Sequence, residues 1–451
     1  MNRRNFIGLS GVCALEFFVA GCRHKLPQRY FAVFGPLQLH SSGVLELPVG
    51  FELRLVQQAG DGMDDGFVMP GQPDGMACFE QEDGSWVLLR NHELSTAAAM
   101  GQWNPEVLGR ADTLDASPRF AAEPRGCVSR VVLDSGRLHS DFSESSFRTR
   151  SVVASHLVLA GTDSNCAGGV VNGGWVSCEE SSAPGHGYAF LTLPGDQALV
   201  APRPIRSWGR FHREAVVIDP ETGTVYMTED RADGCFYRFV PEDSREPLGV
   251  GKLQALAVPG VPDTNAHAVA GDGPAWPDGH VWKVEWVDIV DPQAKEESCR
   301  AQGARAGATG FCRGEGLSLG RGVWFSASTG GAAGGGQVFR LDSEGRTLTL
   351  ELEVTDRSIL SCPDNLCLTP WGDLLMCEDN YERTEQVTHQ HIRGMRPDGS
   401  IYDLARNPMN QPDDAGPEFT GACFSPDGRV LFVNVQTPQH MTLAIRGPWP
   451  T

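Results

Sequence analysis

The sequence predicts an all-β chain folded as a six-bladed β-propeller with inserted loops. Glycine is abundant, at 53 of 451 residues, and long helical stretches are absent, which favours short strands joined by tight turns. A glycine turn, an apolar strand and a polar or acidic end recur together six times along the chain. The copies stand roughly 50 to 100 residues apart, within or above the spacing of propeller blades that carry inserted loops.

The repeated unit is a hairpin with a polar cluster at both of its ends. The second strands are predicted at 83–93 (DGSWVLLRNHE), 172–180 (NGGWVSCEE), 221–230 (ETGTVYMTED), 320–329 (GRGVWFSAST), 370–379 (PWGDLLMCED) and 426–436 (PDGRVLFVNVQ). Across one short strand, each is preceded by a polar cluster: QPDGMACF, DSNCAGGV, HREAVVID, RGEGLSLG, SCPDNLCL or EFTGACFS. Because the two strands are antiparallel, the clusters at the two ends of the hairpin meet at one rim.

Six such rims converge on one mouth of the central channel if the hairpins form the inner part of each blade. The acids expected at this mouth are Asp74, Glu93, Glu179, Glu214, Glu229, Glu315, Asp364, Glu378 and Glu418. Two carboxylates about 4 Å apart repel by roughly 4 kcal/mol at an effective dielectric constant near 20, so the mouth must bind protons or cations.

The chemistry of these side chains points to a metal site. Oxygen-rich sites suit calcium, whereas a thiolate suits a softer metal such as iron, and Cys178 stands beside Glu179 and Glu180. Taken singly, each acid is more commonly a solvated edge residue or the partner of an arginine, and Cys178 is more commonly a packed hydrophobe. The case for metal therefore rests on recurrence at one geometric position.

The N-terminus is expected to be a targeting segment. Residues 1–21 contain paired Arg3 and Arg4 before Phe6, which resembles a twin-arginine export signal, and VAGC places Cys22 at a lipoprotein-like cleavage box. We expect a linker at 22–45 and a single propeller domain at 46–451. The protein is expected to be exported to the periplasm or cell envelope, with a possible lipid anchor at Cys22.

Other features exclude several function classes. A formal net charge of −20 argues against a nucleic-acid partner. The chain has no GxSxG, GxxxxGK[ST] or HExxH motif, so neither a serine nucleophile nor a phosphate-binding loop is visible.

Of the 13 cysteines, 11 follow Cys22, and Cys299 with Cys312 or Cys362 with Cys367 are plausible disulfide partners.

Several stretches together resemble the PhoX-type alkaline phosphatases. They run in order from about Asp74 to Trp449 and include PDGM, LLRNHE, AGTDSNCAGG, WVSCEE, GRFHREAVVIDPETGTVYMTED, CPDNL, LLMCED and EFTGACFSPDGRVLFVNVQTP. Known members look like six-bladed propellers with a mixed iron and calcium cluster in the channel, and they hydrolyse phosphate monoesters outside the cytoplasm. The resemblance therefore implies Ca²⁺ and Fe³⁺ as cofactors.

The resemblance also implies roles for individual residues. The expected metal ligands are Cys178, Glu179, Glu229, Glu378, Glu93, Asp74 and Glu315, and the expected catalytic residues are Asn165, Glu229 and Glu378, with Asn165 facing the phosphate. The chain departs from the family at Ser164, where members usually have an arginine before NCAGG. Arg313 or Arg393 could substitute for that arginine.

The favoured function is a monomeric, metal-dependent phosphatase that acts on small phosphorylated substrates or binds phosphate. A calcium-dependent lactonase or esterase is the alternative among enzymes, since other propellers with acidic channels carry that chemistry. A lipid-anchored, metal-binding propeller without turnover is the non-enzymatic alternative.

Overall fold

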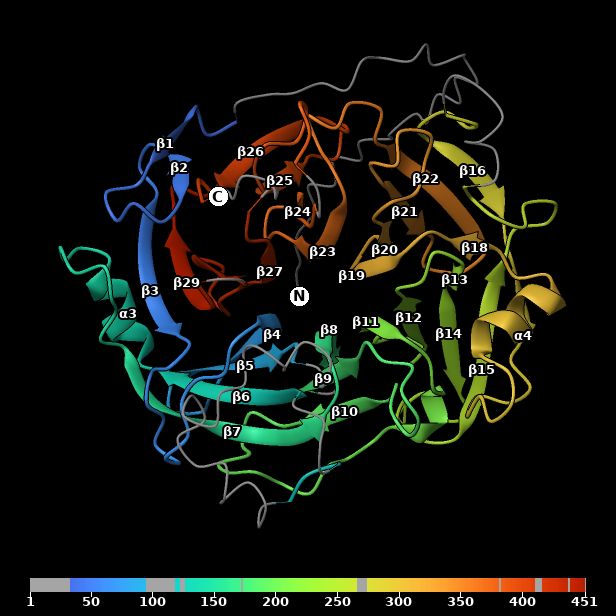
Figure 1. The fold of residues 1–451 in the computed structure, drawn as a ribbon, viewed down its shortest axis with the longest axis horizontal. Coiled ribbons are helices and arrows are strands. Elements are labelled where there is room, and N and C mark those ends of the chain that lie inside the picture. The colour runs from blue at the N-terminus through green and yellow to red at the C-terminus, as the bar shows by residue number, and fades with distance from the viewer. Residues whose placement is uncertain are drawn as a thin grey trace, which may run out of the picture.

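The fold is a ring of six antiparallel sheets around a central axis, which confirms the predicted six-bladed β-propeller (Figure 1). The computed structural model describes residues 33–94, 118–121, 126–171, 173–265, 274–380, 383–409, 416–436 and 439–450. The expected export signal and Cys22 lie outside these residues. No helix in these ranges is long and apolar enough to cross a membrane.

Each sheet is built outward from a hairpin beside the axis. The innermost strands are β4 (Pro73–Glu80), β8 (Asn165–Val171), β11 (Arg213–Ile218), β19 (Gly314–Gly320), β23 (Pro363–Leu368) and β27 (Phe419–Phe424). The second strands are β5 (Trp86–His92), β9 (Gly174–Glu179), β12 (Val225–Glu229), β20 (Gly322–Ala327), β24 (Leu374–Glu378) and β28 (Val430–Val435). All six repeated segments therefore form second strands, as the sequence predicts.

The outer strands complete the blades. The first three blades, which begin with β4, β8 and β11, add β6 (Gly126–Leu133) and β7 (Val152–Thr162); β10 (Ala189–Thr192); and β14 (Tyr237–Pro241), β15 (Gly251–Ala257) and β17 (Glu285–Asp288), respectively. The blades that begin with β19 and β23 add β21 (Gln337–Leu341), β22 (Thr347–Glu353) and β16 (His280–Lys283); and β25 (His391–Met395), β26 (Ile401–Arg406), β2 (Glu46–Pro48) and β1 (Leu37–Leu39). The closing blade, which begins with β27, adds β29 (Met441–Arg446) and β3 (Glu52–Gln58). A small pair, β13 (Gly234–Cys235) with β18 (Gly310–Phe311), and the helices α3 (Ser135–Asp141), η1 (Arg206–Trp208) and α4 (Cys299–Ala306) lie in the insertions.

The two ends of the described chain close the ring. β3, near the N-terminal end, pairs antiparallel with β29, so the last blade contains both early and late residues. The fully buried guanidinium of Arg90 donates to Thr442 and Gln57, which ties the first blade to this closing blade. β1 and β2 form the outer edge of the β23–β26 sheet, so the sheet structure begins within the range 22–45 that we expected to be a linker.

A β-bulge recurs at the same place in all six hairpins. The register slips between Pro73 and Met76 in β4, and between the corresponding residues Asn165/Gly168, Arg213/Val216, Gly314/Leu317, Pro363/Leu366 and Thr420/Cys423 in the other innermost strands. A bulge bends a strand and re-aims the side chains beside it. Glycine is needed here because the innermost strands approach closely: a Cβ on Gly316 would stand 2.5 Å from the Asp364 carbonyl oxygen.

Both expected disulfides are wrong, since the cysteines in question are free thiols. Cys299 is buried at the start of α4 and its thiol donates to the carbonyls of Arg210 and Pro292. Cys312 contacts the Thr329 hydroxyl instead. The other pair, 362 with 367, is separated by the β23 bulge, so a short spacing in the sequence does not bring the two sulfurs together.

Candidate metal centre

Five groups of side chains that could each hold a metal ion form one connected series around the channel mouth, which we call the ring. Within each group, one ligand atom per residue lies within 4.8 Å of the others, and the groups are Asp74–Glu93–Cys166, Cys166–Glu180–Glu214, Glu180–His212–Asp230, Glu214–Glu315–Asp364 and Asp364–Asp379–Glu418. Neighbouring groups share Cys166, Glu180, Glu214 or Asp364. The ring therefore runs through five blades and returns to the closing blade at Glu418.

The ring residues occupy equivalent positions in their hairpins. One set is the second residue of the innermost strand, within the bulge: Asp74, Cys166, Glu214, Glu315 and Asp364. Another set directly follows the second strand: Glu93, Glu180, Asp230 and Asp379. A third set directly precedes the innermost strand and includes His212 and Glu418. The predicted meeting of the two hairpin ends at one rim is thus confirmed.

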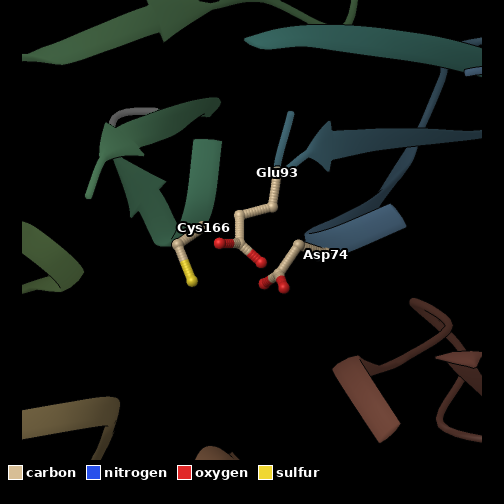
Figure 2. Close-up of side chains that lie close together, drawn as sticks. All are labelled: Asp74, Glu93 and Cys166. Atoms are coloured by element: carbon tan, nitrogen blue, oxygen red, sulfur yellow. The ribbon is translucent and has the colours of Figure 1, made fainter. Parts of the chain in front are cut away.

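One part of the ring combines two carboxylates with a thiol. Figure 2 shows Asp74, Glu93 and Cys166 extending into the same space from β4, the end of β5 and β8. The side-chain amide of Gln436 donates to Asp74 Oδ2 at 3.0 Å and to Glu93 Oε2 at 2.9 Å, so it holds both carboxylates from the closing blade. The remaining lone pairs of these carboxylates are free to bind a cation.

The acids of the ring are buried close together, and this shifts their ionisation. Burial, together with nearby Asp379 and Asp230, raises the pKa of Glu93 to about 7. Burial and Asp379 raise the pKa of Asp364 to about 8. Burial and the neighbouring carboxylates also raise the pKa well above its usual value in Asp74, Glu180, Glu214, Glu315 and Glu418. Without cations, the ring therefore keeps protons that metal ions would replace.

A buried oxygen without a partner supports the same conclusion. Glu214 Oε2 is fully enclosed and has no hydrogen-bond partner in the described part of the chain. Leaving a buried carboxylate oxygen unpaired costs free energy that a bound cation would recover. The donor set, many carboxylates and one thiol, fits hard cations together with one softer metal.

One arginine reaches this ring of acids. Arg313 donates from Nε to Asp230 Oδ1 at 2.9 Å, and its Nη2 lies 2.8 Å from Glu315 Oε1. It directly precedes β19, with a left-handed φ of 57°. Of the two arginines considered as substitutes at the phosphate site, Arg313 therefore lies at the ring. Arg393 instead pairs with Glu378 on the outer side of β24.

The structure does not bring four of the seven expected ligands into these groups, namely Glu179, Glu229, Glu378 and Cys178. Glu179 accepts hydrogen bonds from His186 and from the backbone of Gly187 and Tyr188. Glu229 accepts from the Tyr237 hydroxyl at 2.7 Å. These carboxylates face the next strand of their own blade and not the channel.

Glu378 has the same orientation. It is bonded to Arg393, His391 and the Ser361 backbone, and although its burial acts to raise its pKa, Arg393 and His391 hold that pKa below the usual value. Successive side chains alternate across a strand, so the acid one residue later in each pair points into the channel. That position holds Glu180, Asp230 and Asp379.

Cys178 and Asn165 also lie outside the groups. Cys178 is fully buried in an apolar cluster that contains Val176 and Trp208, and burial raises its pKa to about 12. The Asn165 amide donates to the Ser177 hydroxyl and accepts from Thr162, so its polar atoms are engaged within the blade. The thiol at the ring belongs to Cys166.

Five ring residues were not among the expected ligands or the acids expected at the mouth, namely Cys166, Glu180, His212, Asp230 and Asp379. A signal for three of them was present, because CEE, TED and CED each end in a second acid. The cysteine of NCAGG also stands where Asp74, Glu214 and Glu315 stand in their hairpins. Aligning the six hairpins by their bulges would have identified it.

The fold and site define a β-propeller with a continuous series of metal-compatible ligands around one channel mouth. A family model for alkaline phosphatase PhoX matches residues 32–439. The chain belongs to the PhoX family and is accordingly a metal-dependent phosphomonoester hydrolase. No curated protein matches the sequence.

The first of two solved structures shares the architecture of this chain. A structure of Pseudomonas fluorescens PhoX in complex with vanadate, a transition state analogue, is 16% identical, with a TM-score of 0.67, and the match covers 93% of this chain and 98% of that one. A gluconolactonase from Xanthomonas campestris is 11% identical, with a TM-score of 0.41, over 92% of this chain and 98% of that one.

Proposed function

We propose that the ring binds Ca²⁺ and Fe³⁺ and that phosphate monoesters are hydrolysed at this mouth, outside the cytoplasm. The observation that carries the proposal is the unbroken series of five ligand groups with one thiol and one guanidinium. When bound, the cations would offset charge on the phosphoryl oxygens and lower the pKa of the attacking water. The vanadate bound to the P. fluorescens relative supports a phosphate-sized ligand here.

The ligands divide by chemical type. Cys166 belongs to two groups and supplies the only thiol among them, so we assign iron to its side of the ring, with Glu214 and Glu180 as oxygen ligands. Asp74 and Glu93 on one side of Cys166 are assigned to calcium. The oxygen-only groups around Glu315, Asp364, Asp379 and Glu418 are also assigned to calcium.

Arg313 is proposed to orient the phosphoryl group. Its Nε and Nη2 already contact Asp230 and Glu315, which fix the guanidinium beside the ring. A guanidinium fixed in this way places a permanent positive charge beside the phosphoryl oxygens and can stabilise the charge that develops on them. This role replaces the arginine that the chain lacks at Ser164.

The expected ligands that face away from the channel take a supporting role in this proposal. Glu179, Glu229 and Glu378 each fix the end of a second strand through buried hydrogen bonds. The next residue of each strand then has a defined direction into the ring. In the same way, Asn165 holds the start of β8 and therefore the position of Cys166.

Export and anchoring complete the proposal. The twin-arginine-like segment at 1–21 would carry a folded chain across the membrane, and Cys22 would attach it to lipid at the cell envelope. The substrate would be a small phosphorylated molecule acted on by a monomer.

The decisive assay is hydrolysis of an aryl phosphate by the purified chain. We expect turnover that is lost after chelation and restored by Ca²⁺, with iron retained in elemental analysis of the untreated protein. A chain with a full complement of iron and calcium and no turnover would contradict the proposal.

A further inference from the structure

One ligand group of the ring contains a histidine, which makes it chemically different from the other four. Glu180, His212 and Asp230 offer ligand atoms within 4.8 Å of one another. Glu180 follows β9, whereas His212 and Asp230 stand at the two ends of the β11–β12 hairpin. The group therefore joins two neighbouring blades.

The imidazole of His212 has one enclosed ring nitrogen without a hydrogen bond among the described residues. The His212 carbonyl accepts a hydrogen bond from the Asp230 backbone N–H at 3.2 Å, which fixes the backbone that carries the imidazole. Its Nδ1 is enclosed and makes no hydrogen bond in the described part of the chain, although Glu180 Oε1 lies 3.4 Å away. A buried ring nitrogen beside two carboxylates is placed as a ligand would be.

The carboxylates of the group keep capacity for a cation. Arg313 donates to Asp230 Oδ1 at 2.9 Å and to Oδ2 at 3.2 Å. Asp230 also shares a side-chain hydrogen bond with Glu180, so three of the four lone pairs on its oxygens are used and one remains for a cation. A metal bound here would take the place of the hydrogen bond between Glu180 and Asp230 and would offset the charge of both carboxylates.

The histidine is specific to this hairpin. The residues that directly precede the innermost strands are Gln72, Ser164, His212, Arg313, Cys362 and Glu418. No other group of the described ring includes an imidazole. Calcium prefers oxygen ligands, whereas imidazole nitrogen suits divalent transition metals.

We propose that Glu180, His212 and Asp230 form a mixed nitrogen and oxygen site that binds a divalent transition metal in preference to Ca²⁺. The inference rests on the proposed function of the ring as a metal centre. It adds a third class of metal to the calcium and iron assigned above.

The test uses Mn²⁺ as a paramagnetic probe. The mature chain, without a polyhistidine tag, is stripped with a chelator, saturated with Ca²⁺ and then titrated with Mn²⁺. We expect pulsed electron paramagnetic resonance to show coupling of the Mn²⁺ to ¹⁴N, which changes when the histidines carry ¹⁵N. His212→Asn should remove this coupling and weaken Mn²⁺ binding by about tenfold or more.

The matched control is His156→Asn. His156 is buried and lies on the outermost strand β7, away from the ring, where it contacts the Asp196 carbonyl. This variant should keep the coupling. The labelled wild-type chain decides the question without any variant, in case His212→Asn does not fold.

Two outcomes overturn the inference: no nitrogen coupling in the wild-type chain, or coupling that His212→Asn retains. Aryl phosphate hydrolysis is measured on the same preparations. Coupling without hydrolysis contradicts only the proposed function, and hydrolysis without coupling contradicts only this site.

Discussion

The Nε of Arg313 lies 2.9 Å from Oδ1 of Asp230, so the arginine at the ring is fixed by a carboxylate of the neighbouring blade. Its Nη2 is also 2.8 Å from Glu315 Oε1. Both anchors are residues that we assign to metal ligation. The anion-binding group and the ligands are therefore oriented by the same contacts.

Replacing Arg313 should weaken phosphate binding without removing metal. Arg313→Gln loses the charge-assisted hydrogen bonds to phosphate, each worth roughly 1.5–3 kcal/mol, so inhibition by inorganic phosphate should weaken by about tenfold or more. Arg340→Gln on outer strand β21 is the control, because Arg340 pairs with Glu351 away from the ring. Unchanged inhibition by phosphate in the Arg313 variant would exclude the proposed role.

Restoring an arginine at Ser164 should strengthen phosphate binding. Ser164 directly precedes β8 with φ of 45°, just as Arg313 directly precedes β19 with φ of 57°. An arginine at 164 would thus adopt the same backbone conformation and reach toward the ring. We expect Ser164→Arg to lower the Kd for phosphate by roughly tenfold, as one added charge-assisted contact would. Ser164→Gln adds length without charge and should leave the Kd for phosphate unchanged. Equal effects of the two substitutions would refute the proposed charge-assisted contact.

Replacing the adjacent acids Glu179 and Glu180 by glutamine should have different effects: one change should reduce stability and the other should reduce metal content. Glu180→Gln removes a ring ligand and should reduce the metal content measured by elemental analysis, with little loss of folding in the stripped protein. Glu179→Gln disrupts the buried hydrogen bonds to His186 and Gly187 and should cost roughly 1–3 kcal/mol of unfolding free energy. If Glu179→Gln loses metal while Glu180→Gln retains it, the assigned orientations are wrong.

The two cysteines near the mouth offer a similar contrast. Cys166→Ser should abolish iron binding, because the hydroxyl replaces the only thiol of the ring. Cys178→Ser should keep iron and instead lower the melting temperature, since it places a hydroxyl in an apolar cluster. Iron content and thermal unfolding of both variants provide the measurement, and iron loss confined to Cys178→Ser would reverse the assignment.

The metal-free protein should lose stability as pH rises. Glu93, with a pKa of about 7, and Asp364, with a pKa of about 8, stay protonated in the folded state at pH values where the unfolded chain has released those protons. The folded state therefore binds more protons between about pH 4 and 8, and its stability falls across that window. A carboxyl whose pKa rises from 4.5 to about 7 contributes roughly 3 kcal/mol to this fall.

Chemical denaturation of chelated protein at pH 5 and pH 8 measures the effect. Added Ca²⁺ should replace the protons and raise stability most at pH 8. Stability of the chelated protein that increases with pH would show that the ring carboxyls do not hold protons in the folded state.

The sequence was sufficient to predict the blades and the mouth, but not the direction of each side chain. Recurrence of glycine turns and apolar strands located all six hairpins, and antiparallel pairing brought Asp74 and Glu93 together correctly. In CEE, TED and CED, however, alternation shows only that neighbouring acids face opposite ways. Which acid faces the channel depends on the twist and register of the blade, which no local pattern reveals.

Cys166 shows a second limit. Its position follows from the bulge in β8, where the register slips between Asn165 and Gly168. A bulge is defined by two strands at once, so NCAGG alone does not indicate where the thiol points. The comparison of six bulges supplies that information.

The closure of the propeller by the pairing of β3 with β29 has a consequence for when the enzyme can complete its metal centre. The ring joins Asp74, an early residue, to Glu418, a late one, and the two are brought together only when the chain ends pair. During synthesis, no partial chain presents the complete set of ligands. Completion of the metal centre is therefore a late event that needs nearly the whole polypeptide, and a truncated product would lack part of the ligand set.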